Sequence, residues 1–253
     1  MSKLALRFLG VGGSSGMELG SAAAVLEQDA APLLQIDCGL DSPARYRQAY
    51  GGFPPAIFIT HTHVDHISGL EPLFAPLWFR DTGEPPPRVF VPAPIVPLLH
   101  ERLAGLSSPL AEGGVNFWDA FQLVPVSRGF WWQGHWFDVF PVRHHGKDFA
   151  FGISLRGSFL YTGDTRPIPE QLECYASLGE QIFHDCQPVG NPSHSGWDDL
   201  AREYSAAVRS RLVLYHFGDM ANREMLLAQG CTVADMGCCY DLRSPQRLAG
   251  AAA

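Results

Sequence analysis

Lysine is scarce in this chain of 253 residues. It occurs only as Lys3 and Lys147, and the formal net charge is −8. A protein that holds a long polyanion normally carries a stripe of basic side chains, because neutralising phosphates supplies most of the affinity. We therefore expect any phosphate-bearing substrate to be a small molecule that is held by the site itself.

Long hydrophobic runs and a regular cysteine framework are also missing. No stretch reaches the roughly 18 uninterrupted apolar residues of a membrane helix, so we expect no membrane span. The six cysteines follow no regular spacing, and a chain of this length can form a core without disulfides. The first residues lack the apolar region and cleavage site of a signal peptide. We expect a cytoplasmic protein with a single domain over residues 1–253, and the sequence leaves open whether it forms a homodimer.

Short apolar runs separated by turn residues make up most of the chain. They form two groups of strands, and each group finishes in alternating strands and helices. This order predicts an α/β fold in which two sheets lie back to back with helices outside.

Three local patterns give finer predictions. Ser42, followed by Pro43, indicates the N-cap of a helix that runs to Tyr50. Residues 196–210 have the apolar periodicity of one continuous helix, and residues 231–236 are typical of a strand.

The stretch HTHVDH, residues 61–66, directly follows an apolar run that predicts a buried strand. Alternate residues of an extended chain share a face, so His61 and His63 can converge on one point. The following turn would bring Asp65 and His66 toward a second point. Imidazole and carboxylate are ligands that zinc favours at catalytic sites, where its bound water has a pKa of about 7. We therefore expect two metal positions, and the alternative is a histidine-rich surface loop.

Three later apolar runs end in a similar way, with a metal-capable side chain and a glycine soon after. These side chains are His144 and His145 in FPVRHHG, Asp164 in FLYTGDT and His216 in LVLYHFGD. Taken alone, His216 could be a packed histidine and Asp164 a turn-forming aspartate. Their shared pattern favours further metal ligands.

These motifs, in this order, resemble the metallo-β-lactamase superfamily over essentially the whole chain. The resemblance implies a four-layer αβ/βα sandwich of two mixed β-sheets and a metal-dependent hydrolase. It also implies the ligands of two metal ions: His61, His63 and one histidine of RHH for the first, Asp65, His66 and His216 for the second, and Asp164 bridging both.

The two histidines of RHH compete for one ligand position. In the phosphodiesterase branch a proline often stands three residues before this ligand, which matches Pro141 and His144. A glycine often follows it directly, which matches His145 and Gly146. We expect His144 to be the ligand, although the pattern leaves both open. Imidazole and carboxylate suit zinc, iron and manganese alike, and zinc is our first expectation.

The chain further resembles the ribonuclease Z-like branch, which places a histidine just before a late helix. His194 takes that place, and Asp185 in IFHDC would orient it. In those relatives the histidine protonates the leaving oxygen, which suits an imidazole with a pKa of about 6.5. The alternative for His194 is a surface histidine near a helix start. The interval from His144 to Asp164 leaves no room for a tRNA-binding arm, so we expect no tRNA processing.

These features predict a phosphodiesterase for a small or cyclic nucleotide-like substrate. A hydroxide between the two metals would attack phosphorus, with Asp65, Asp185 and His194 as the catalytic side chains. One alternative is a metal-dependent hydrolase of a lactone, thioester or β-lactam, which would not need His194. Another is a non-catalytic sensing module on the same fold.

Overall fold

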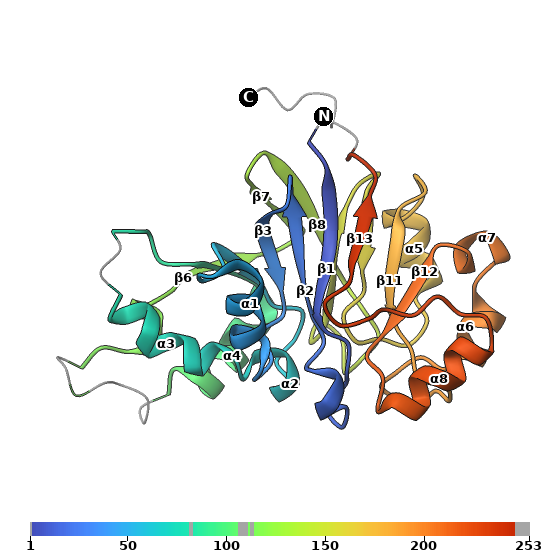
Figure 1. Ribbon diagram of the computed structural model, residues 1–253, viewed down its shortest axis with the longest axis horizontal. Coiled ribbons are helices and arrows are strands. Elements are labelled where there is room, and N and C mark those ends of the chain that lie inside the picture. The colour runs from blue at the N-terminus through green and yellow to red at the C-terminus, as the bar shows by residue number, and fades with distance from the viewer. Residues whose placement is uncertain (1, 81–82, 106–110, 112–113, 246–253) are drawn as a thin grey trace.

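The computed structural model describes residues 2–80, 83–105, 111 and 114–245. Two mixed β-sheets pack against each other, with helices on their outer sides (Figure 1). The first sheet has the order β13-β1-β2-β3-β4-β5-β6 and the second β12-β11-β10-β9-β8-β7. This arrangement confirms the predicted α/β sandwich.

The bounds of the elements are as follows. In the first sheet the strands are β1 Leu4–Gly10, β2 Ala23–Gln28, β3 Ala31–Ile36, β4 Ala56–Phe58, β5 Arg88–Pro92, β6 Gln122–Val126 and β13 Cys239–Leu242. In the second they are β7 Gly129–Trp132, β8 His135–Pro141, β9 Phe151–Leu155, β10 Phe159–Tyr161, β11 Gln181–Asp185 and β12 Leu212–Tyr215. The α-helices are α1 Ser42–Tyr50, α2 Val64–Ile67, α3 Leu70–Trp78, α4 Val96–Leu103, α5 Pro169–Tyr175, α6 Trp197–Glu203, α7 Ala206–Arg209 and α8 Met220–Ala228.

Each sheet changes from antiparallel to parallel pairing along its width. In the first sheet β3, β4, β5 and β6 pair in parallel, and in the second β10, β11 and β12 do so. The carboxyl ends of parallel strands meet at one edge of a sheet, which is where ligands bind in open α/β sheets. The fold therefore presents two sets of strand ends to a common site.

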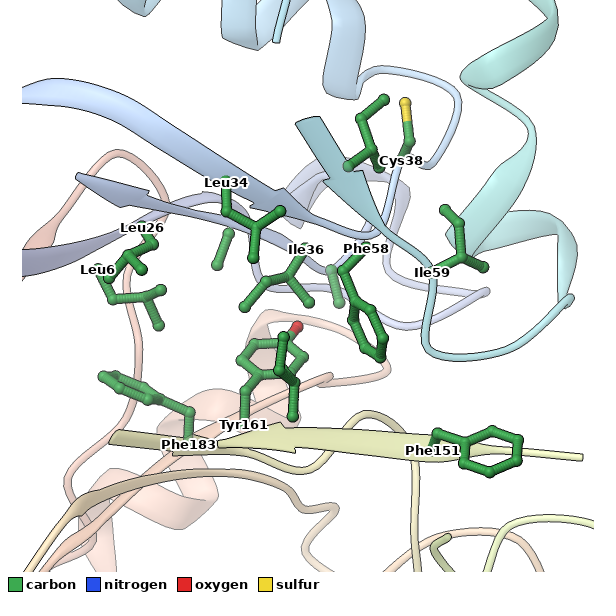
Figure 2. Close-up of a cluster of buried hydrophobic side chains, with 14 of the residues drawn as sticks. Leu6, Leu26, Leu34, Ile36, Cys38, Phe58, Ile59, Phe151, Tyr161 and Phe183 are labelled. Atoms are coloured by element: carbon green, nitrogen blue, oxygen red, sulfur yellow. The ribbon is translucent and has the colours of Figure 1, made fainter. Parts of the chain in front are cut away.

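Apolar side chains from the two sheets meet in the core. Leu6 and Phe8 alternate with more polar positions on β1 and point inward, where both are buried. Figure 2 shows Leu6 and Ile36 of the first sheet above Tyr161 and Phe183 of the second. The rings of Phe8 and Phe183 lie 5.6 Å apart. Burial of each such side chain contributes about 1.5–3 kcal/mol, so this interface fixes the relative position of the two sheets.

The predicted N-cap at Ser42 was wrong. Helix α1 begins at Ser42, and Asp41 is the N-cap residue without a capping side-chain hydrogen bond. The Asp41 carboxylate instead accepts hydrogen bonds from the Ser21 amide at 3.0 Å and from the Arg45 side chain. The Ser42 amide is already used in a turn with the carbonyl of Gly39.

The helix predicted over residues 196–210 is in fact two helices, α6 and α7. Tyr204, between them, has extended backbone. Its buried hydroxyl accepts a hydrogen bond from the Ile168 amide and contacts Nε2 of His184, both at 2.8 Å. Ser205 then caps α7 by accepting from the Val208 amide. Tertiary contacts of one tyrosine therefore outweigh the local periodicity.

The strand predicted over residues 231–236 is only an isolated bridge between Val233 and Leu214. The strand of this region is β13, which pairs antiparallel with β1. Among the described residues, no helix is long and apolar enough to cross a membrane.

Candidate metal centre

The seven side chains predicted to hold metal ions lie together where strands from both sheets end. The HTHVDH loop follows β4 of the first sheet. The other three of these side chains follow β8, β10 and β12 of the second. In all, the described residues form three overlapping groups that could hold a metal ion: His61, His63, His144 and Asp164; Asp65, His66 and His216; and Asp164, Asp185, His194 and His216.

The first group surrounds one face of Asp164. In each group one ligand atom per residue lies within 4.8 Å of all the others. The Nε2 atoms of His61 and His144 are 3.6 and 3.7 Å from Oδ2 of Asp164. Nδ1 of His63 lies 3.1 Å from Nε2 of His144. Nδ1 of His144 contacts the carbonyl of Ser193 at 2.8 Å, so Nδ1 carries the proton and Nε2 is left with a lone pair.

The second group lies close to the same carboxylate oxygen, Oδ2 of Asp164. Oδ2 of Asp164 is 3.3 Å from Nε2 of His66 and 3.2 Å from Nε2 of His216. Nε2 of His216 is also 3.5 Å from Oδ2 of Asp65. Asp164 is thus positioned between the two groups, as a bridging ligand must be.

Several of these buried polar atoms lack a partner within the described chain. The unpartnered atoms include Nε2 of His61, His66 and His216 and Oδ1 of Asp164. Leaving such an atom unsatisfied costs about 1–3 kcal/mol, and a bound cation would remove that cost. The donor set and its unpaired lone pairs therefore fit divalent metal ions.

The opposite ring nitrogens of the histidines are fixed by hydrogen bonds. Nδ1 of His66 donates to Asp37 at 2.8 Å, and Nδ1 of His61 lies 3.0 Å from the Thr60 hydroxyl. Asp37 also accepts from the Thr60 amide at 2.8 Å, although its own backbone is left-handed with φ of 60°. These bonds direct both Nε2 atoms toward the centre of the cluster.

The charges of the cluster are strongly coupled. Burial by itself lowers the pKa of His216, but the carboxylates of Asp164, Asp185 and Asp65 together outweigh burial and raise the pKa to about 10. Burial and the neighbouring imidazoles of His144 and His145 lower the pKa of His63 to about 4. Burial raises the pKa of Asp65, but its hydrogen bond with His216 and nearby histidine charge bring it down to about 2. Positive charge therefore stabilises the buried carboxylates. Protons on the histidines provide this charge when no metal ion is bound.

Of the two histidines of RHH, the structure brings His144 into the cluster. His144 is buried, whereas His145 is exposed. Nε2 of His145 lies 2.7 Å from Nε2 of His63, at the solvent edge of the site.

His194 and Asp185 form a pair beside the second group. Nδ1 of His194 lies 2.8 Å from Oδ2 of Asp185, a buried carboxylate that also accepts from the Thr165 amide at 2.9 Å. The His194 ring stacks on that of His216 with centroids 5.0 Å apart. Burial lowers the pKa of His194, but the Asp185 carboxylate outweighs burial and raises it above the ordinary value of 6.5. The Asp185 carboxylate therefore favours the protonated form of the His194 ring.

Gln187 holds the turn that carries His216, a role that the sequence did not reveal. His216 has left-handed backbone, with φ of 71°. The Gln187 side chain donates to the carbonyl of His216 and accepts from the Gly218 amide at 3.2 Å. Thr60 and Ser193 were missed for the same reason, because each acts through a partner that is identified only once the chain is folded.

The glycine-rich loop after β1 serves packing. The Gly12 and Gly13 amides donate to the carbonyls of Gly20 and Phe217, both at 2.8 Å. A Cβ atom at Gly13 would lie 2.8 Å from the His216 ring, so only glycine fits there.

Two cavities adjoin the cluster at opposite ends of its row of histidines. One of about 380 Å³ is lined by His63 and His145. The other, of about 480 Å³, is lined by His194 and His216.

Comparisons with known proteins agree with this geometry. The family model of the Anti-Pycsar protein Apyc1 matches residues 4–240. The Anti-Pycsar protein Apyc1 of Paenibacillus harenae is 28% identical over 221 residues, which cover 85% of this chain and 90% of the relative. The Anti-Pycsar protein Apyc1 of Bacillus phage 010DV004 is 30% identical over 233 residues, which cover 85% of this chain and 89% of the relative.

More distant matches concern other hydrolases and the fold. Ribonuclease Z of Bradyrhizobium diazoefficiens is 29% identical over 180 residues, 69% of this chain and 55% of that protein. A diphosphatase from the PhnP family superposes with a TM-score of 0.75 and 18% identity, covering 96% of this chain and all of the other. The metallo-β-lactamase fold protein YhfI from Bacillus subtilis superposes with a TM-score of 0.71 and 13% identity. The match covers 94% of this chain and 99% of YhfI. The predicted superfamily is confirmed.

Proposed function

Because the chain belongs to the family of the Anti-Pycsar protein Apyc1 and is a metal-dependent hydrolase, we propose that it hydrolyses phosphodiester bonds in small or cyclic nucleotides. The observation that carries this proposal is the His194–Asp185 pair beside the metal ligands. An alkoxide is a poor leaving group, so cleavage of a sugar–phosphate ester needs a proton donor at the departing oxygen.

Two divalent metal ions, with zinc as the first candidate, complete the proposed site. His61, His63, His144 and Asp164 would hold one ion, and Asp65, His66, His216 and Asp164 the other. Metal ions held there would lower the pKa of bound water and neutralise charge on the phosphate oxygens.

The protein's own catalytic contribution is the delivery of a proton. Asp185 holds Nδ1 of His194, so that Nε2 faces the substrate. The raised pKa increases the share of the ring that carries the proton. General acid catalysis of this kind contributes about 10²–10⁴-fold to the rate.

A small substrate is favoured by the size and charge of the protein. The cavities at the site measure about 380 and 480 Å³, and the net charge is −8. Between His144 and Asp164 the chain forms only β9, β10 and their turns, without an arm for tRNA. Two of the matched proteins, a ribonuclease Z and a diphosphatase, are named for the cleavage of phosphate esters and anhydrides, which supports phosphorus as the attacked centre.

The test compares substrates with poor and good leaving groups. Metal-loaded protein should hydrolyse cyclic AMP, with a ribose alkoxide as the leaving group, and bis(p-nitrophenyl) phosphate, from which nitrophenolate departs without protonation. We expect His194→Ala to lower kcat for cyclic AMP by about 10²–10⁴-fold and for the nitrophenyl ester much less. His100→Ala, at an exposed histidine on α4, is the matched control.

Failure of the metal-loaded protein to hydrolyse any phosphodiester would contradict the proposal. Equal losses of kcat on both substrates would show that His194 is not the general acid. Rapid lactone, thioester or β-lactam hydrolysis that is insensitive to His194→Ala would favour attack at carbon instead.

A further inference from the structure

The cavity beside His194 is lined without acidic or basic side chains other than histidine. Its lining, within the described chain, comes from the loops after β1, β11 and β12 and from α8, and includes no lysine, arginine, aspartate or glutamate. An adjacent cavity of about 380 Å³ is different, because Arg143, Arg166 and Arg202 line it. Away from His194 and His216, the wall of this cavity carries no charged side chain and therefore suits an uncharged group.

Most polar side chains of this cavity are engaged in holding the loops. Gln187 bonds the His216 turn, and Oδ1 of Asn191 accepts from the amides of Ser193 and His194 at 2.8 and 3.0 Å. The Ser15 hydroxyl donates to the carbonyl of Gly218 at 3.1 Å. These groups shape the wall of the cavity.

Asn222 and Ser14, in contrast, are available to a ligand. The Asn222 side-chain amide has no hydrogen-bond partner in the described part of the chain, and neither does the Ser14 hydroxyl. An amide group offers both a donor and an acceptor, which is the pattern that a nucleobase edge requires.

Apolar side chains stand beside these free polar groups. Met225 and Val189 line the same cavity and are 50% and 78% exposed. Asn222 and Met225 are three residues apart on α8, so they share a face of the helix. A flexible thioether next to an apolar branched side chain provides a surface for a flat aromatic ring.

We infer that this cavity binds the nucleoside part of the substrate, with Asn222 and Met225 as specificity-determining residues. The inference rests on the proposed function. A general acid must lie within about 2.6–3.2 Å of the oxygen that it protonates, so the leaving group occupies the cavity that His194 lines. In a cyclic mononucleotide that oxygen belongs to the ribose, and the attached nucleoside is uncharged, as the lining requires.

The reaction is balanced by water alone. One P–O ester bond of the ring breaks and one P–O bond to water oxygen forms. The proton of His194 goes to the ribose oxygen, and a proton of the attacking water replaces it. The product is a nucleoside monophosphate that remains in the cavity until release.

The test measures kcat/KM for cyclic AMP and cyclic UMP, each divided by kcat/KM for bis(p-nitrophenyl) phosphate, which carries no nucleoside. We expect Asn222→Ala and Met225→Ala to lower this ratio about tenfold or more, mainly through KM. Asn222→Ser, which keeps a hydrogen-bonding group, should recover part of the ratio. The matched control is Met220→Ala, because Met220 lies on the same helix, is 42% exposed and does not line the cavity.

The outcomes separate the two proposals. Ratios for Asn222→Ala and Met225→Ala that stay within about threefold of the wild-type ratio would overturn the nucleoside site, while phosphodiester hydrolysis stands. A fall of the ratio in Met220→Ala as large as in Met225→Ala would also overturn it. Absence of turnover on all three substrates in the wild-type protein would instead contradict the proposed phosphodiesterase.

Discussion

Asp185 fixes the orientation of the His194 ring and raises its pKa. Its buried carboxylate holds Nδ1 of the ring and raises the pKa of His194 above the ordinary value of 6.5. In the proposed mechanism the protonated ring is the acid, so the rate should fall as pH rises through this pKa. The His194–Asp185 pair therefore predicts at which pH kcat/KM begins to fall on the alkaline side.

We expect Asp185→Asn to move this alkaline limb to lower pH. Asparagine keeps the shape of the side chain but removes the negative charge, so the pKa of His194 should drop. The measurement is the pH dependence of kcat/KM for cyclic AMP in both proteins. Since Oδ1 of Asp185 is also 3.5 Å from Nδ1 of His216, metal content is measured in parallel. An unchanged alkaline limb with full metal content would show that His194 is not the titrating acid.

Gln187 leads to a second prediction. His216 has left-handed backbone, which costs a residue other than glycine roughly 1–3 kcal/mol, and Gln187 holds that turn. We expect Gln187→Ala to relax this turn and to reduce bound metal from two ions toward one per chain, as measured by elemental analysis. Gln181→Ala is the control, since Gln181 lies on β11, the strand that precedes Gln187, and its side chain also donates to a backbone carbonyl, that of Arg211. Equal metal loss in both variants would make the effect one of general destabilisation.

The sequence predicted which side chains gather in the cluster better than which residues orient them. The metal-capable side chains occur in a recognisable order at strand ends, so the place of His61 and Asp164 in the cluster could be predicted without a structure. Thr60 and Gln187 act by hydrogen bonds to partners that folding brings close, at Asp37 and His216. Nothing local in the sequence distinguishes them from ordinary polar residues.

Helix α8 carries the proposed nucleoside contacts, and its first turn depends on a cap. Oδ1 of Asp219 accepts a hydrogen bond from the backbone amide of Asn222 at 2.7 Å. Loss of an N-cap costs about 1 kcal/mol, so Asp219→Ala should lower Tm by about 2–4 °C. It should also raise KM for cyclic AMP, because Asn222 and Met225 lose a fixed position. Asp219→Ser retains a capping oxygen and should behave like wild type, and an equal rise of KM in Asp219→Ser would contradict this explanation.

Errors at the level of helices and strands share one cause. The local sequence pattern placed α1 and β4 well, since helix signals mark the first and an apolar run the second. It missed the break at Tyr204 and the strand β13, which depend on a buried hydroxyl and on pairing with β1. Long-range contacts of this kind leave little trace in the neighbouring sequence.

The two halves of the molecule meet at the metal centre as well as in the core. The loop after β4 brings ligands from the first sheet, and the loops after β8, β10 and β12 bring the others from the second. Metal ions bound there would connect the sheets at the edge where their apolar contact ends. Metal affinity should therefore appear as stability of the whole chain.

We expect a strong chelator to lower Tm, and zinc or manganese to restore it. Binding at about 100 times Kd stabilises by about 2.7 kcal/mol, which corresponds to roughly 5–10 °C for a chain of this size. The shift should shrink at low pH, because the raised pKa values of His66 and His216 let protons compete with the metal. His61→Ala should lose most of the shift, whereas His145→Ala should keep it. A chelator that strips the metal, as verified by elemental analysis, without any change of Tm would show that the centre does not contribute to holding the two sheets together.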